Sequence, residues 1–337
     1  MSARCDDLVN WVLRDRNCPK RGPLSDRPRL RRVLSALIAV IATAPALCAE
    51  ISVSRGEEFK TRAGTTISAT VVRFAPPNVN VQVLATAGLR PAKSSERAGL
   101  SIEAASAVAS LRTLSRGDLV IANGGFSGAQ VDRPVGLTIA GGNVVSLPDY
   151  TIRRGDPGSQ CPALRVDHVR HSGVLCVKQG GNVSIEHLDN MDIRSCFEAL
   201  QAGPMLVDAP GQNGICRSAT DDRPYRRTAA CTSSDGFALI VTEQPVLLYD
   251  LAEWLAAPKD KGGLGCNSAL NLSGDSSSGA LYRSGGTGAP WRKIGDGTFP
   301  LATLIAVGQR PAPANNKVAV PPSQSNVPPG ASKAARR

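Results

Sequence analysis

The chain has 337 residues, of which 42% are hydrophobic and 20% charged, and its formal net charge is +11. This length can form one large domain or two small ones, the charged fraction excludes wholesale disorder, and no apolar run has the length of a stable membrane span. The charge lies at the ends: residues 1–32 and 310–337 each carry +5, which leaves +1 for the middle. A nearly neutral middle argues against nucleic acid as a partner.

The N-terminal segment has the pattern of a secretory signal peptide. An apolar run at 33–44 follows four arginines and precedes small residues, with cleavage expected near Ala46 or Ala49. We therefore expect a leader over residues 1–49 and a secreted or periplasmic protein that has no stable membrane span after processing.

Two alternatives for this segment stay open. It could be an uncleaved N-terminal anchor, or Cys48 could accept a lipid, although Leu47 directly before it argues against a lipoprotein. At the other end, residues 310–337 are rich in Pro, Ala, Ser and basic residues, so they predict a disordered basic tail.

The cysteine count agrees with export. Beyond the leader the chain keeps six cysteines, at positions Cys161, Cys176, Cys196, Cys216, Cys231 and Cys266. An even number in an exported chain predicts three disulfides, whose pairing stays open. A zinc cluster is the competing interpretation, but no two of these cysteines have C-x-x-C spacing.

The first half of the predicted domain consists mainly of strands. Strands are expected at 65–74 and 78–87, a helix at 101–115 from its apolar spacing, a strand at 119–126 and a hairpin at 137–147.

The second half repeats the hairpin pattern. In chain order we expect a hairpin at 174–188, a helix at 192–201, a hairpin at 227–243, a helix at 246–257, and strands at 268–274 and 280–283. Hairpins outnumber helices, so residues 50–309 are predicted to form one disulfide-stabilised α+β domain, with mixed or antiparallel sheets and a few flanking helices.

Five segments occur in an order that resembles the phosphodiester glycosidase family. They are NGGF at 123–126, PVGLTIAGGNV at 134–144, ALQAGPMLV at 199–207, RTA at 227–229 and LGCNSALNLSGDSSSGAL at 264–281. The resemblance covers roughly residues 100–285. It implies an exported hydrolase that cleaves sugar-1-phosphodiester linkages in envelope or exopolysaccharide glycans.

The family motif is altered at its acidic position. The family typically has Asn-Leu-Asp-Gly-Gly followed shortly by Ser, whereas this chain has Ser273 at the Asp position and Asp275 where the second Gly is expected. Residues two apart on a strand share a face, so Asp275 could restore the reach of the missing carboxylate. The same change could equally mean lost activity.

The chemistry of such a linkage requires anion recognition more than acid catalysis, because the phosphate is already a good leaving group. Arg227 could hold phosphate oxygens with two parallel hydrogen bonds. A carboxylate could then position water or stabilise the charge at the anomeric carbon. Asp275 is the first candidate for that role, with Glu198 and Glu243 behind it.

The resemblance also implies roles for polar and glycine residues nearby. Ser277 matches a family position, Asn123 could hold a sugar hydroxyl or an N-acetyl group, and Ser273 lies in the substrate-binding turn. Gly124, Gly125 and Gly274 could present backbone N–H groups to an anion. No cofactor is predicted, and the question of a bound divalent ion stays open, as does the oligomeric state.

Each of these residues also has a plainer interpretation. The glycines could simply form turns, and Asp275 could be an ordinary loop residue. Arg227 stands near Arg226, Asp221 and Asp222, a pattern typical of a solvated ion-pair cluster.

Three other functions compete with hydrolysis of a phosphodiester. A glycan-binding protein could keep the fold without the carboxylate at 273. A serine hydrolase is suggested by GDSSSG at 274–279, which is similar to a chymotrypsin-like motif, but the matching histidine is absent. Metal binding by His168, His171 and His187 with Asp167 has weak support, because H-x-x-H lacks further metal-ligand spacing here.

Overall fold

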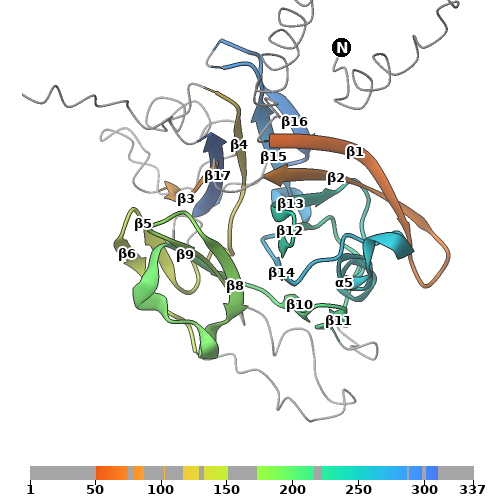
Figure 1. Ribbon diagram of the computed structural model, residues 1–337, viewed down its shortest axis with the longest axis horizontal. Helices are drawn as coiled ribbons and strands as arrows, with labels where there is room; N and C mark the ends of the chain where they lie inside the picture. Colours follow the sequence, from red (N-terminus) through yellow and green to blue (C-terminus); the bar gives the residue numbers. More distant parts are fainter. Residues whose placement is uncertain are drawn as a thin grey trace, which may run out of the picture.

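The computed structural model describes residues 51–74, 79–86, 102, 117–128, 133–150, 173–215, 222–286, 288–297 and 301–309. Strands dominate this part of the chain, and they form three sheets in which every strand pair is antiparallel (Figure 1). The one α-helix described is α5 (Leu248–Ala256).

The first sheet has seven strands in the order β1-β2-β13-β12-β14-β10-β11. Their bounds are β1 (Ile51–Lys60), β2 (Thr66–Phe74), β13 (Gly236–Thr242), β12 (Thr228–Ser233), β14 (Ser268–Asn271), β10 (Met205–Ala209) and β11 (Gln212–Asn213).

The second sheet has five strands in the order β16-β15-β4-β17-β3. Their bounds are β16 (Arg292–Gly295), β15 (Gly279–Arg283), β4 (Leu119–Asn123), β17 (Thr303–Gln309) and β3 (Val79–Ala85).

The third sheet, at the lower left of Figure 1, has the order β6-β5-β9-β7-β8. Its strands are β6 (Asn143–Ser146), β5 (Thr138–Ala140), β9 (Cys196–Ala202), β7 (Gly173–Lys178) and β8 (Val183–His187). Short 3-10 helices complete the described structure: η3 (Leu188–Asn190), η4 (Ile193–Ser195), η5 (Lys259–Lys261) and η6 (Asp275–Ser277).

The largest hydrophobic core lies where the three sheets face one another, and period-two alternation along the strands explains it. In β4, Val120 and Ala122 point into this core, while Leu119 and Ile121 join a smaller cluster on the other face of the sheet. Successive side chains of a strand point to opposite faces, so a strand buried on both sides is apolar throughout, as β4 is.

Helix α5 covers the outer face of the first sheet. Leu251 and Leu255 are fully buried against that sheet, and Trp254 stacks on Phe59 of β1 with ring centroids 4.4 Å apart. A stack of two aromatic rings stabilises this packing by about 1 kcal/mol beyond the area that it buries. Through this stack the helix holds β1, the edge strand of the first sheet, in place.

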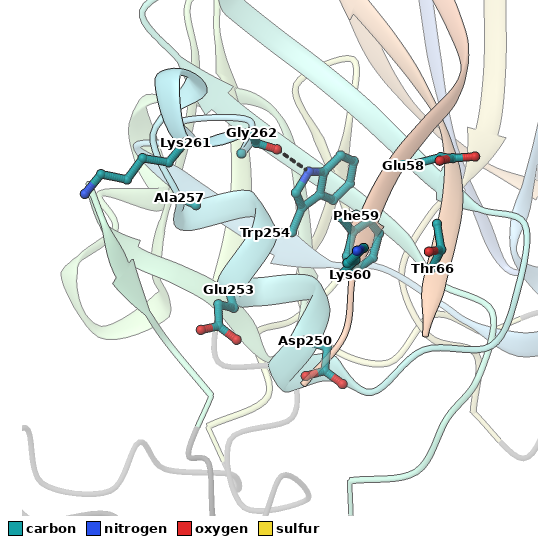
Figure 2. Close-up of a pocket in the computed structure, with 11 residues that line it drawn as sticks. Glu58, Phe59, Lys60, Thr66, Asp250, Glu253, Trp254, Ala257, Lys261 and Gly262 are labelled. Carbon is teal, nitrogen blue, oxygen red and sulfur yellow. Dashed lines mark hydrogen bonds between the residues drawn. The ribbon is translucent and has the colours of Figure 1, made fainter. Parts of the chain in front are cut away.

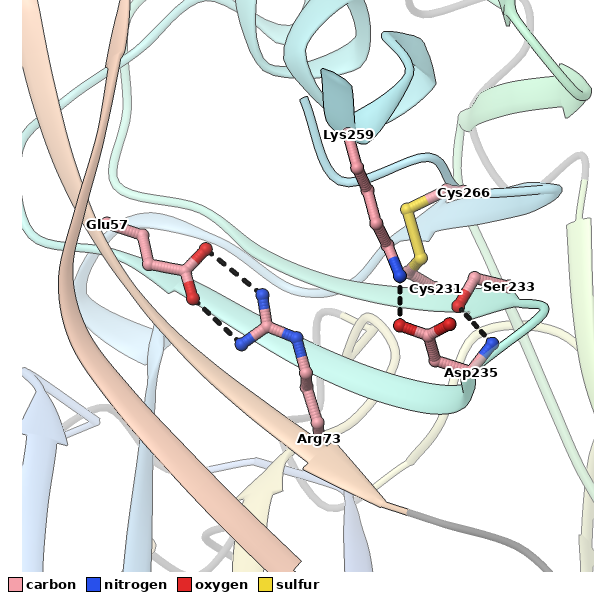
Figure 3. Close-up of a disulfide and its surroundings, with 7 residues drawn as sticks. All are labelled: Glu57, Arg73, Cys231, Ser233, Asp235, Lys259 and Cys266. Carbon is pink, nitrogen blue, oxygen red and sulfur yellow. Dashed lines mark hydrogen bonds and ion pairs between the residues drawn. A yellow bond between two sulfur atoms is a disulfide. The ribbon is translucent and has the colours of Figure 1, made fainter. Parts of the chain in front are cut away.

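Two disulfides are present among the described residues, Cys176–Cys196 and Cys231–Cys266. The second joins β12 to the segment before β14 (Figure 3). Two ion pairs lie beside it, Lys259 with Asp235 and a bidentate pair between Arg73 and Glu57. Cys161 and Cys216 lie outside the described residues.

The structure confirms the predicted hairpins and the helix at 246–257, but it corrects the segment at 192–201. This segment is not helical beyond η4: it continues as β9, the central strand of the third sheet. Burial of Glu198, Leu200 and Ala202 on one face and of Ala199 and Gln201 on the other is what a central strand produces.

Some other expectations concern residues outside the described part of the chain, and the structure refines the rest. Except for Ile102, the predicted helix at 101–115 lies outside the described residues, and so do the leader and the tail. The sheets are antiparallel throughout rather than mixed, and one α-helix stands where a few were expected. None of the helices described has the length and apolar character that crossing a membrane requires.

Candidate functional site

The predicted site residues meet where the chain passes from the first sheet to the second. After β14 the chain runs through Ser273, Gly274 and η6 before it enters β15. Asn123 ends β4 in the second sheet and Gly124 and Gly125 follow it, while Arg227 directly precedes β12 in the first sheet. The strand ends thus bring three stretches that are distant in sequence to one junction.

Asn123 braces this junction through both ends of its side chain. It is fully buried, its Nδ2 donates to the Ser273 carbonyl at 2.5 Å, and its Oδ1 accepts from the Gly279 N–H at 3.2 Å. A buried amide with backbone partners at both ends holds two segments together. These contacts give Asn123 a bracing role at the junction.

Gly124 and Gly125 are glycines because other backbone comes too close for a side chain. A Cβ on Gly124 would lie 2.8 Å from the Thr303 carbonyl oxygen, and one on Gly125 would lie 2.9 Å from the Gln201 oxygen. Both N–H groups already donate to Thr303, at 3.1 and 3.0 Å. The two glycines therefore pack the sheets together, and their N–H groups are not directed at an external anion.

Arg227 is buried and held on several sides. Its backbone N–H donates to the Thr242 hydroxyl at 2.8 Å, its Nη2 donates to the Arg223 carbonyl at 2.7 Å, and its Nε donates to the Val246 carbonyl at 3.4 Å. The guanidinium also lies over the Tyr225 ring, 5.2 Å from the ring centroid. Only 9% of the side chain is exposed, so the predicted solvated ion pair is instead a buried one.

One edge of this guanidinium remains open. No acceptor among the described residues takes Nη1, which lies 3.8 Å from where a Cβ on Gly274 would be. The Gly274 N–H likewise donates to no acceptor in the described part of the chain. A guanidinium nitrogen and a backbone N–H are both donors that suit phosphate oxygens.

Burial lowers the pKa of Arg227 to about 10, because removing the guanidinium from water penalises its charged form. Asp222, Tyr225 and Asp275 act in the opposite direction and support the charge. The group is therefore protonated at neutral pH. The influence of Asp275 indicates that its carboxylate lies within electrostatic range of Arg227.

Asp275 lies exposed at the start of η6, with a positive φ of 58°. Its backbone N–H donates to the Arg226 carbonyl at 2.8 Å, which ties this turn to the segment that carries Arg227. A positive φ costs energy for a residue other than Gly, and Asp is among those that tolerate it best. The turn thus exposes the carboxylate to solvent.

Ser273 and Ser277 form a buried pair beneath the turn. Their hydroxyl oxygens are 2.8 Å apart, and the Ser277 hydroxyl also donates to the Gly274 carbonyl at 2.5 Å. The position at which the family has a carboxylate is therefore occupied by a hydroxyl that is already bonded. No histidine contacts Ser277 in the described part of the chain, so its contacts give the serine-hydrolase alternative no support.

Asp222 is the residue that sequence reasoning undervalued. Its carboxylate accepts the N–H groups of Leu248 and Tyr249 at the start of α5, at 2.9 and 3.0 Å, and lies 3.8 Å from Arg227 Nη2. An acidic residue favours a helix N-terminus by hydrogen bonding and by the helix dipole. Asp222 stands 26 and 27 residues before the two N–H groups that it accepts, so no local pattern in the sequence marks this contact.

Neither of the two other candidate carboxylates, Glu198 and Glu243, joins the group of residues around Arg227. Glu198 is buried in β9 and accepts the Val83 N–H at 3.1 Å, and its burial raises its pKa. Glu243 is exposed and contacts Thr70 at 3.5 Å. Glu198 therefore joins the third sheet to β3, and Glu243 contacts Ser68 and Thr70 of β2 in the first sheet.

The described residues contain no group of three His, Cys, Asp or Glu side chains that could hold a metal ion. His187 pairs with Asp208 at 2.8 Å and so joins β8 to β10. His168, His171 and Asp167 lie outside the described residues.

A separate cavity of about 480 Å³ lies between α5 and the β1–β2 hairpin (Figure 2). Phe59 and Trp254 lie at its centre, and Glu58, Lys60 and Glu253 are among the charged residues around it. None of the eight predicted site residues lines this cavity.

The fold and the ordered residues at the sheet junction define a class of protein, and comparison with known proteins names it. The family model of the phosphodiester glycosidases matches residues 116–308, which is more than half of the chain. The chain belongs to the phosphodiester glycosidase family. The comparison with curated protein sequences gave no match.

Solved structures agree at the level of the fold. The chain is similar to the catalytic domain of zebrafish N-acetylglucosamine-1-phosphodiester alpha-N-acetylglucosaminidase, auto-inhibited by its pro-peptide. The identity is 15% and the TM-score is 0.51, over 79% of this chain and 85% of that one. A hypothetical protein from Synechocystis has 15% identity and a TM-score of 0.47, over 80% of this chain and 65% of that one. An exported protein from Burkholderia pseudomallei has 13% identity and a TM-score of 0.42, over 74% of each chain.

Proposed function

We propose that this protein hydrolyses the glycosidic bond of sugar-1-phosphodiester linkages in envelope or exopolysaccharide glycans. The observation that carries the proposal is the buried Arg227 guanidinium, whose Nη1 edge is open toward the Gly274 turn. Membership of the phosphodiester glycosidase family supports a hydrolase of this class.

In this proposal Arg227 binds the phosphate. Its Nε and Nη2 are engaged by backbone carbonyls, so the group cannot rotate away, and Nη1 with the Gly274 N–H takes the phosphate oxygens. A positive group that is fixed before the substrate arrives stabilises charge on the leaving phosphate without reorganisation. The Ser273–Ser277 pair holds the shape of the turn.

Asp275 supplies the carboxylate. Water attacks the anomeric carbon, the bond between that carbon and the phosphate oxygen breaks, and the bonding electrons leave with the phosphate. The carboxylate orients the water and accepts its proton, and the products are free sugar and a phosphomonoester. Asp275 thereby supplies the carboxylate that the family has at the position of Ser273.

The test is release of free sugar and phosphomonoester from a panel of sugar-1-phosphodiesters. Asp275→Asn and Arg227→Lys should each lower kcat/KM by about 100-fold or more, because each removes a group that acts in the transition state. Asp235→Asn and Arg226→Lys are the matched controls, since Asp235 pairs with Lys259 elsewhere and Arg226 is more exposed. Absence of turnover across the panel would refute hydrolysis.

A second candidate function has its own supporting observation. Because the Ser273 hydroxyl is bonded to Ser277 at the family's acidic position, the same site could bind sugar phosphates without cleaving them. Calorimetry that shows binding dependent on Arg227, with no product over long incubation, would select this function.

We also propose that the protein works outside the cytoplasm. The two disulfides support this location, because such bonds persist in oxidising compartments. Cell fractionation of the tagged full chain, with a test for removal of the N-terminal segment, checks the proposal. Recovery of unprocessed protein in the cytoplasm alone would contradict it.

A further inference from the structure

A second group of cations lies apart from Arg227, at the edge strands β1 and β16. The guanidinium of Arg55 lies 5.6 Å from the centroid of the Tyr282 ring, and that of Arg292 lies 5.9 Å from the same centroid. Both arginines are exposed, whereas Tyr282 is buried. The ring is attractive to cations on its faces, so it accounts for part of this convergence.

The backbone brings the two arginines together from different sheets. Arg292 stands opposite Tyr282 in the β15–β16 pair. Arg55 lies in the irregular part of β1 between Ser54 and Glu57, beside Gly56 with its φ of 71°, and its Nη2 donates to the Lys293 carbonyl at 3.4 Å. A bulge in an edge strand redirects a side chain in this way.

Arg55 and Arg292 have no carboxylate partner among the described residues, whereas Arg62 pairs with Asp250, Arg73 with Glu57 and Arg226 with Asp296. In the described part of the chain, the contacts of the two arginines are the shared ring and, for Arg55, the Lys293 carbonyl. Two like charges held near one ring repel each other, and an anion between or beside them removes that cost.

The position of this group relative to the proposed site is favourable for one long ligand. Tyr282 is three residues along β15 from Gly279, which receives the brace from Asn123. At ~3.4 Å per residue this places the Tyr282 backbone about 10 Å along the strand from Gly279. Arg226 and its partner Asp296 lie on the intervening edge, where β16 ends.

We propose that Arg55, Tyr282 and Arg292 form a second anion-binding site, which takes a further phosphate group of a polymeric phosphoglycan. The inference rests on the proposed function, and it narrows the substrate class to glycans with repeated phosphodiester linkages. One phosphate lies at Arg227 while another, along the same polymer, lies at the arginine pair.

The test is binding of poly(glycerol phosphate) to the full chain, measured by calorimetry at several salt concentrations. Arg55→Gln/Arg292→Gln should bind about tenfold more weakly, and its slope of log K against log salt should be shallower by about 1.5, as expected for two lost charge contacts. The matched control is Lys178→Gln/Lys261→Gln, which removes the same charge from exposed positions in the third sheet and beside α5. The control should change affinity by less than about threefold, because a distant charge is screened.

Two further arms separate this inference from the proposed function. Arg55→Lys/Arg292→Lys should restore most of the affinity, since the charge remains, and circular dichroism checks that all variants fold. With inorganic phosphate as the ligand, the affinities of Arg55→Gln/Arg292→Gln and of its control should show no comparable difference. If Arg55→Gln/Arg292→Gln and the control Lys178→Gln/Lys261→Gln lose affinity equally, the second site is overturned even if hydrolysis is observed. If, in an Arg227→Gln background, Arg55→Gln/Arg292→Gln loses more affinity than the control double variant, the result supports the second site even if no substrate is hydrolysed.

Discussion

At the residue scale, the site depends on how Arg227 is held. Backbone carbonyls of Arg223 and Val246 engage two of its nitrogens, and Asp222 and Tyr225 support its charge. Backbone carbonyls hold the guanidinium in one orientation. Nη1 has no acceptor among the described residues, and in the proposed function it is the nitrogen that binds phosphate.

The pKa of about 10 at Arg227 gives a pH dependence. Phosphate binding requires the protonated guanidinium, so kcat/KM should fall as the pH rises through about 10. The folded pKa lies below the unfolded value, so between these two values the unfolded state binds more protons and stability from this group rises with pH. Loss of activity in that range therefore does not come from unfolding driven by Arg227. A pH–rate profile with parallel circular dichroism checks the prediction, and activity that stays level well above pH 10 would contradict it.

Asp222 should act as a positioning residue. Asp222→Asn should raise KM for a phosphodiester about tenfold and lower stability by about 1–2 kcal/mol, because the α5 N-terminus and Arg227 both lose a charged acceptor. Since Asp222 raises the pKa of Arg227, the alkaline limb of the rate profile should also shift to lower pH in this variant. Steady-state kinetics and calorimetry measure the three effects. Asp260→Asn, at an exposed position of η5, is the control. A stability loss with an unmoved alkaline limb would limit Asp222 to capping the helix.

At the scale of elements, the junction works because strands of different sheets end at one place. Gly124 approaches Thr303 of β17, Gly125 approaches Leu200 and Gln201 of β9, and the Ser273 N–H donates to the Gly124 carbonyl at 3.0 Å. The segment after β4 is therefore in contact with all three sheets. Small changes there are expected to affect both the packing of the sheets and the turn at 273–277.

Gly124→Ala should destabilise the fold by about 1–3 kcal/mol, because the added methyl group meets backbone atoms of Thr303 that cannot move independently of β17. Gly180→Ala is the matched control: nothing lies within 4 Å of a Cβ there, and Gly180 is not among the glycines with positive φ. Chemical denaturation of both variants checks the difference. Equal stability of the two would show that the junction relaxes freely.

The element scale also shows why some strands escaped prediction. β17 is a central strand whose two faces are both buried, so Ile305 and Val307 lie in the main core while Leu304 and Ala306 lie outside it. Its apolar run has no alternation to mark it as a strand. β9 carries Glu198 and Gln201 among apolar residues. Glu198 bonds to Val83, and Gln201 bonds to Leu137 and Asp149, so partners distant in sequence account for the burial of these polar side chains.

At the scale of the whole molecule, the disulfides contribute to stability according to the chain they close. Cys231–Cys266 spans 35 residues and Cys176–Cys196 spans 20. Loop-closure entropy predicts that replacing each pair by serines costs about 3–4 kcal/mol, with the longer loop costing slightly more. Calorimetry of the two double variants, with a check of each for monomeric behaviour, measures the costs. Midpoints unchanged from the parent would show that the packed sheets alone set the stability.

The sequence by itself determined the family, the strand-rich fold, the turn positions and the residue types of the site. These follow from local signals: glycines at turns, alternation along hairpins, and an ordered set of motifs. It also indicated Arg227 and Asp275 as a pair, which the structure places within electrostatic range of each other. The tertiary structure decided what depends on distant contacts, namely the pairing of Cys231 with Cys266 and the bracing role of Asn123. Burial and the partners of each polar atom are set by segments far apart in the chain, so no local pattern of residues specifies them.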